Sequence, residues 1–130
     1  MLRKSLTLLC AAAVWLALVT LFAIPEPSRA QDPARGKALF EKRCTGCHAL
    51  DKEKEGPRLR GVYGRTSGSV SSFNYSDAVK KARITWDAAS LDKWLTDPDK
   101  VIPENDMSFQ VVKADERADI IAYLKQLSGH

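Results

Sequence analysis

Residues 44–48 read Cys44-Thr45-Gly46-Cys47-His48, a C-x-x-C-H stretch. This spacing is typical of covalent haem attachment. On one helical turn, thiols three residues apart can reach the two vinyl groups of a haem, and the next residue projects an imidazole toward the iron. The stretch therefore predicts one covalently bound haem c, attached through Cys44 and Cys47, with His48 as an iron ligand.

Two other chemistries use cysteines at this spacing. A thioredoxin-like dithiol needs a β-α-β setting, which this sequence lacks. A structural zinc site needs four ligands, and beyond the two cysteines and His48 the chain after residue 30 offers only His130 as a further Cys or His. Either alternative predicts colourless protein with titratable thiols. We favour haem because the five matched residues follow a segment with the features of an export signal.

A haem iron bound by His48 has an opposite face, and the composition narrows the choice of its second ligand. The chain has two methionines, Met1 and Met107. Met107 lies in a polar, proline-stiffened loop, which weakens the alternative of a gap-filling core side chain. His130 is the other candidate, if the C-terminus folds back. A thioether raises the reduction potential, and filling both faces excludes oxygen and substrate, so we predict an electron carrier and no enzyme.

The 130 residues divide after residues 1–30, which have the features of an export signal peptide. A basic start precedes an uncharged run over residues 6–24, and two small residues favour cleavage before Gln31. The uncharged run is nearly long enough to cross a bilayer, so a retained membrane anchor is the alternative. In both cases residues 31–130 form one small domain that faces an extracytoplasmic space.

Short helices dominate the predicted secondary structure. Amphipathic patterns and capping residues predict helices over residues 34–43, 76–81, 87–97 and 115–127, with a brief turn of helix between Pro98 and Pro103. Residues 56–72 are predicted as loop because they are rich in Gly, Ser, Arg and Pro. The two best strand candidates, residues 69–71 and 111–112, are too short for a buried strand. The predicted fold class is therefore all-α.

The charge distribution gives little support to nucleic-acid binding. The formal net charge is +4, from 20 Lys and Arg against 16 Asp and Glu. The leader holds three basic residues and one acidic residue, so the remainder carries only +2. Its basic residues are interleaved with acidic ones and form no stripe.

Further motifs accompany the C-x-x-C-H stretch: Gly56-Pro57, Gly61-Val62-Tyr63-Gly64-Arg65, Phe73-Asn74-Tyr75-Ser76-Asp77-Ala78, Ile84-Thr85-Trp86, Ile102-Pro103, Met107 and Glu116 to Leu124. With them the chain resembles the class I cytochromes c of the mitochondrial type, in particular their soluble bacterial relatives, over residues 36–127. The resemblance implies the class I cytochrome c fold, with four or five short helices around one haem c.

The resemblance also implies a cellular role. It suggests a periplasmic monomer that carries single electrons from a quinol-oxidising cytochrome complex to a terminal oxidase or a photosynthetic reaction centre. Contact with the membrane is expected only if the leader stays attached. An alternative from the enzyme class is a peroxidase that acts when Met107 leaves the iron.

Several residues take roles from the resemblance. The carbonyl of Pro57 accepts the Nδ1 proton of His48 and so strengthens the imidazole as a donor to iron. Three side chains hydrogen-bond a haem propionate whose burial would otherwise be costly: Arg65, Tyr75 and Trp86. The first helix crosses the last, through Gly36 and Phe40 on one and Ile120 and Tyr123 on the other.

Two of the departures from the family pattern concern the methionine sulfur and the exposed haem edge. The family usually has a tyrosine whose hydroxyl hydrogen-bonds the methionine sulfur, and Trp94 stands at that position. An indole N–H donates but cannot accept, so the local network must differ. The lysines that surround the exposed haem edge in mitochondrial proteins are replaced by a mixture of charges: Arg43, Lys100 and Lys113 with Asp99, Glu104 and Asp106.

Overall fold

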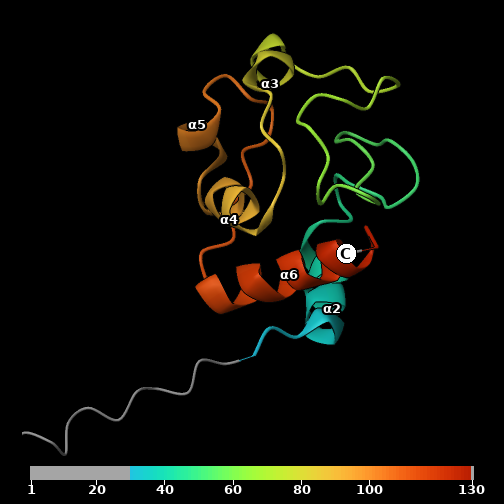
Figure 1. The fold of residues 1–130 in the computed structure, drawn as a ribbon, viewed down its shortest axis with the longest axis vertical. Coiled ribbons are helices and arrows are strands. Elements are labelled where there is room, and N and C mark those ends of the chain that lie inside the picture. The colour runs from blue at the N-terminus through green and yellow to red at the C-terminus, as the bar shows by residue number, and fades with distance from the viewer. Residues whose placement is uncertain (1–29, 130) are drawn as a thin grey trace, which may run out of the picture.

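The computed structural model describes residues 30–129. Five helices follow one another in this part of the chain: α2 (Pro33–Arg43), α3 (Asp77–Ala82), α4 (Ala88–Thr96), α5 (Pro98–Val101) and α6 (Ala114–Gln126) (Figure 1). It contains no strand, only an isolated bridge between Thr66 and Thr85. The predicted all-α class is therefore confirmed. The uncharged run of the predicted leader and the candidate ligand His130 lie outside the described residues.

Side-chain caps set where α2, α3 and α4 begin. The carboxylate of Asp32 accepts hydrogen bonds from the first backbone N–H groups of α2, and Pro33 occupies its first turn. Ser76 caps α3 with its hydroxyl. Asp87 and Ser90 form a reciprocal capping box at the start of α4, with both hydrogen bonds at 2.8 Å. Because these contacts are local, the helix ends lie within one residue of the predicted ranges.

The first and last described helices cross each other closely, as predicted (Figure 1). Gly36 of α2 lies against the backbone of Asp119 in α6, where the absence of a side chain permits the approach. The rings of Phe40 and Tyr123 pack beside this point with centroids 5.6 Å apart. Ile120 is almost completely buried in the same interface. The crossing fixes the position of the C-x-x-C-H stretch, because that stretch directly follows α2.

The long irregular segment between α2 and α3 lies beside the chain that leads into α4 (Figure 1). Backbone hydrogen bonds join Gly64 N to Trp86 O at 2.6 Å and Trp86 N to Arg65 O at 2.9 Å. Ser67 N donates to Ile84 O at 2.7 Å. These bonds place Arg65 next to Trp86, although the two residues are far apart in sequence.

The loop that carries Met107 returns across α4. Helix α5 ends at Val101 and is followed by its C-cap residue Ile102, whose N–H donates to the carbonyl of Pro98 at 2.9 Å. After Met107 the chain comes back to α4, where Val111 N donates to Leu95 O at 2.7 Å. The hydrophobic core lies among these elements: Phe40, Val62, Trp86, Leu91, Leu95, Ile102, Val111, Ile120, Ile121, Tyr123 and Leu124.

Candidate functional site

A single cavity of about 340 Å³ brings together all nine residues that the sequence singled out. They come from the end of α2, the irregular segment, the chain between α3 and α4, α4 itself and the loop after α5: Cys44, Cys47, His48, Pro57, Arg65, Tyr75, Trp86, Trp94 and Met107. Most of the remaining lining is apolar, and much of it belongs to the core. An apolar cavity with a few converging polar groups is the usual form of a cofactor site.

The C-x-x-C-H stretch continues the turn of α2. Cys44 N donates to the carbonyl of Phe40 at 2.8 Å, and the carbonyl of Cys44 accepts from both Cys47 N at 3.2 Å and His48 N at 2.9 Å. The ammonium of Lys54 donates to the two carbonyls inside the stretch. The two sulfurs and the imidazole are therefore presented to the cavity from one ordered turn.

The cysteine sulfurs fit thioether attachment to a haem. Cys44 and Cys47 are both free, so no disulfide joins them. Burial raises the pKa of the Cys44 thiol to about 11, and the charge of Arg43 opposes this only weakly. The surroundings of Cys44 thus favour an uncharged sulfur, which a thioether supplies.

The geometry around His48 fixes which ring nitrogen is free. Its Nδ1 lies 2.8 Å from the carbonyl oxygen of Pro57. A carbonyl only accepts, so Nδ1 carries the proton and Nε2 keeps its lone pair. Burial lowers the pKa of His48, with a smaller contribution from the charge of Lys54, while the Pro57 hydrogen bond opposes the shift. The imidazole is therefore neutral at pH 7, as an iron ligand must be.

Gly56 is a site residue to which the sequence motifs assigned no role. A Cβ at this position would lie 2.3 to 2.8 Å from atoms of the His48 ring. The backbone N–H of Gly56 donates to the carbonyl of Cys47 at 2.8 Å, which fixes the segment against the C-x-x-C-H turn. A glycine directly before Pro57 was the only available signal.

We predict that Gly56→Ala displaces the imidazole of His48, because the new methyl group occupies the space of the ring. The free energy of unfolding of the haem-loaded protein should fall by about 1–3 kcal/mol, the usual cost of overpacking. Gly46→Ala is the control, since a Cβ there meets no atom within 4 Å. Denaturant titration and the optical spectrum are the measurements. Equal stability of the two variants, with unchanged spectra, would refute the role of Gly56.

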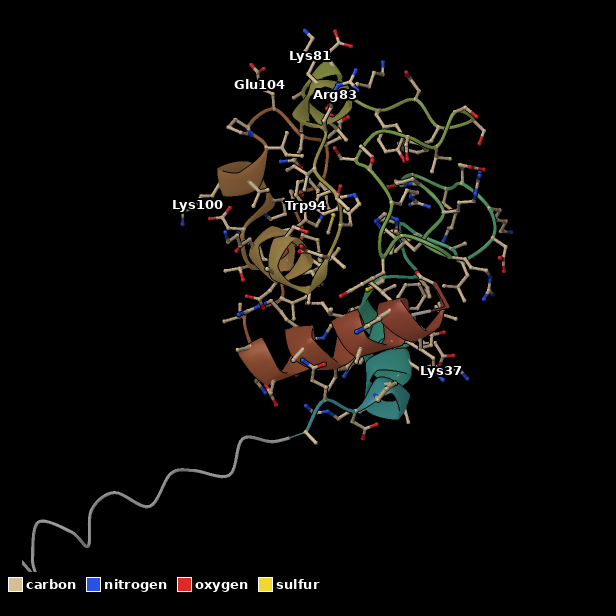
Figure 2. The ribbon with its side chains drawn as sticks, viewed as in Figure 1. Lys37, Lys81, Arg83, Trp94, Lys100 and Glu104 are labelled. Atoms are coloured by element: carbon tan, nitrogen blue, oxygen red, sulfur yellow. The ribbon has the colours of Figure 1, made fainter. Side chains whose placement is uncertain are left out.

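Trp94, which also lines the cavity, hydrogen-bonds the sulfur of Met107. Its indole Nε1 donates to Sδ at 3.2 Å. Figure 2 shows Trp94 pointing from α4 into the interior, and its ring packs on Trp86 with centroids 5.2 Å apart. The substitution of tyrosine by tryptophan therefore keeps a donor on the sulfur but offers no acceptor there. A thioether sulfur has two lone pairs, so one remains available for a metal.

Arg65 is a partly buried cation. Its guanidinium donates to the carbonyls of Arg58 and Arg60 at 2.9 and 3.4 Å, and no carboxylate pairs with it among residues 30–129. Burial lowers the pKa of Arg65. Burial also raises the pKa of Tyr75, while the neighbouring charge of Arg65 opposes that shift. A partly buried cation beside a protonated phenol suits an anionic group from a ligand.

The alternative chemistries find no support in the described part of the chain. Residues 30–129 contain no group of three or more His, Cys, Asp or Glu residues placed to hold a metal ion. The cysteines follow helix α2 and not a β-α-β unit, and no strand occurs among the residues that the structure describes. None of the helices described is long and apolar enough to cross a membrane.

Comparison with known proteins agrees with this site. The chain matches the cytochrome c family over residues 33–128. It is 50% identical over 99 residues to cytochrome c of Euglena viridis, covering 74% of this chain and 97% of that one. It is 41% identical over 116 residues to cytochrome c2 of Blastochloris viridis, covering 86% and 91%. The solved structure of cytochrome cH from Methylobacterium extorquens superimposes with a TM-score of 0.69 at 40% identity, covering 73% of this chain and 98% of that one.

The chain belongs to the cytochrome c family, and its fold is that of the class I cytochromes c. Members of this family are one-electron carriers and not enzymes, and they bind one haem c covalently through cysteines. Cys44 and Cys47 provide the two sulfurs. The protein is thus a monohaem c-type cytochrome that carries electrons between redox partners.

Proposed function

We propose that His48 and Met107 bind the haem iron from its two faces and that the protein shuttles electrons between membrane complexes in the periplasm. The observation that carries the ligand pair is the His48–Pro57 hydrogen bond of 2.8 Å, which leaves Nε2 free in the cavity that Met107 also lines. The indole Nε1 of Trp94 donates a hydrogen bond to the sulfur of Met107. Each candidate ligand therefore has one partner that orients it.

The bound haem supplies a redox-active iron that takes up and releases one electron. The protein's own residues decide what else reaches it. With both His48 and Met107 bound to it, the iron would have no open coordination position for oxygen or peroxide. The apolar lining keeps water away and favours the less charged, ferrous state.

We further propose that Arg65, Tyr75 and Trp86 hydrogen-bond a haem propionate. Arg65 is partly buried without a carboxylate partner among residues 30–129, and Tyr75 is protonated beside it. Trp86 is held next to Arg65 by the backbone bond between the two residues. An ionised propionate would provide the missing negative charge and accept hydrogen bonds from all three.

The ligand pair is tested by the optical spectrum of the oxidised protein, in which a ferric iron–thioether bond gives a weak long-wavelength band. We expect this band in the native protein and its loss on adding excess imidazole, which displaces the weaker thioether ligand. A native spectrum that lacks the band would contradict Met107 ligation. Such a spectrum would favour His130 or an open coordination position.

We propose that residues 1–30 direct export and that a quinol-oxidising cytochrome complex reduces the protein. A terminal oxidase or a photosynthetic reaction centre then oxidises it. The cytochrome c2 and cytochrome cH relatives in bacteria support this setting. N-terminal sequencing of soluble and membrane fractions distinguishes the two fates of the leader. We expect the soluble periplasmic protein to begin at Gln31. Full-length protein in the membrane fraction would instead identify residues 1–30 as a retained anchor.

We predict that electron transfer to such partners slows only gently as ionic strength rises. The basic residues that the resemblance places around the exposed haem edge have acidic neighbours: Arg43 and Lys113 approach Glu116 at 2.9 and 3.8 Å, and Lys100 approaches Asp97 at 2.9 Å. In Figure 2 Lys81 and Arg83 lie together at α3, while Lys100 lies at the left edge beside α5 and Lys37 at the lower right beside α2, so the four labelled cations do not form one patch. Long-range electrostatic attraction between the protein and a redox partner is therefore weak even at low ionic strength, and added salt has little attraction to screen. Stopped-flow rates across a salt series are the measurement, and a steep decline would contradict the prediction.

A further inference from the structure

The loop that carries Met107 is organised by one side chain, Asn105. Its carboxamide nitrogen donates to the carboxylate of Asp99 and to the carbonyl of Ile102, both at 2.8 Å. Its carboxamide oxygen accepts from the backbone N–H of Met107 at 2.7 Å. The first turn of α5, the end of α5 and the backbone of Met107 are thus connected through one amide group.

The hydrogen bonds of Asn105 offset a strained backbone conformation in this loop. Glu104, directly before Asn105, has a φ of 63°, a left-handed conformation that costs free energy for a residue with a side chain. Asn105 is partly buried and lines the same cavity as Met107. Both of its amide hydrogens and its oxygen are used, so no smaller polar side chain can make the same three bonds.

The other side-chain hydrogen bonds to this loop, from Trp94 and Arg117, do not hold the backbone of Met107. Trp94 holds the sulfur of Met107 but not its backbone. Arg117 donates to the carbonyls of Val111 and Val112 at 3.0 and 2.9 Å, which fixes the loop only after it has returned to α4. Asn105 is therefore the side chain that restrains the ligand residue from the N-terminal side.

We propose that Asn105 is a positioning residue for Met107: it holds the backbone so that the sulfur is presented to the iron. The proposal rests on Met107 being the second iron ligand. Without the Asn105 bonds, residues 103–107 gain freedom in the state where the sulfur has left the iron. The equilibrium then shifts away from ligation.

The experiment uses haem-loaded protein and measures the affinity of exogenous imidazole, which competes with Met107 for the ferric iron. Asn105→Ala removes the acceptor of the Met107 N–H and the two hydrogen bonds to Asp99 and Ile102. The apparent affinity for imidazole should then rise roughly tenfold, as expected for the loss of one net hydrogen bond. Asn105→Ser keeps a possible acceptor and should give a smaller effect. Gln110→Ala removes an exposed amide from the same loop, after Met107, and should bind imidazole as the native protein does.

A second readout separates positioning from general stability. Hydrogen exchange at the Met107 amide should accelerate in Asn105→Ala, while exchange in α2 and α6 stays at the native rate. The proposal would be overturned if Asn105→Ala bound imidazole with the affinity of the native protein. It would also be overturned if the variant changed only the free energy of global unfolding and not the exchange at the Met107 amide. If the native protein itself lacks the iron–thioether band, the ligand assignment fails instead, and the two failures are distinguishable.

Discussion

Gly36→Ala is expected to lower the free energy of unfolding of the haem-loaded protein by about 3 kcal/mol or more. In an exposed helix this substitution stabilises by roughly 0.5–1 kcal/mol, because alanine is the better helix former. Here a Cβ would lie 1.9 Å from the carbonyl oxygen of Asp119 and 3.0 Å from the Cβ of Tyr123. Neither atom can move unless α2 and α6 separate, and overpacking of this kind is costly.

Denaturant unfolding followed by circular dichroism measures this effect. Lys37→Ala is the control, because Lys37 is the next residue of α2 and points away from the molecule (Figure 2). We expect the control to change stability by no more than about 0.5 kcal/mol, the usual range for exposed positions. If Gly36→Ala is as stable as the native protein, the helix crossing described above is wrong.

Met107→Ala is expected to convert the carrier into a protein with an open iron. The iron–thioether band should disappear, and the reduction potential should fall on the order of 0.1 V or more, since axial ligands span about 0.8 V in haem proteins. Peroxide turnover should appear at the same time, because one face of the iron becomes accessible. Potentiometric titration and a peroxidase assay on the same sample are the measurements.

Ser108→Ala is the matched control, since Ser108 is the exposed next residue of the same loop. It should keep the band, the potential and the low peroxide turnover of the native protein. Retention of the band in Met107→Ala would show that another residue binds the iron. Strong peroxide turnover by the native protein, with the band intact, would undercut the carrier role.

The helices were predictable because their determinants are local. Asp32, Ser76 and Asp87 cap the helices that follow them, and the proline at 98 separates α4 from α5. The C-x-x-C-H stretch was predictable for the same reason, since its chemistry depends on five consecutive residues. The resemblance then supplied the residues that the fold brings to the same cavity from distant parts of the chain.

Other features depend on contacts that no local pattern reveals. Arg117 lies in α6 among charged residues, yet it is 8% exposed and pairs with Asp92 of α4 at 2.7 Å. Gly56 matters only because the ring of His48 folds back over it. Asn105 is one polar residue in a polar loop, and its role emerges only once Asp99 and Met107 are placed around it. Sequence alone gives the identity of such residues but not their partners.

The measurement that tests the central claim most directly is haem staining after denaturing electrophoresis, combined with a reduced-minus-oxidised spectrum of the same exported protein. We predict that the pigment migrates with the polypeptide, that Cys44→Ala/Cys47→Ala abolishes this, and that the native oxidised protein carries the iron–thioether band. A well-folded but colourless protein, or pigment that separates from the native chain on denaturation, would contradict the covalent haem on which every role described here depends.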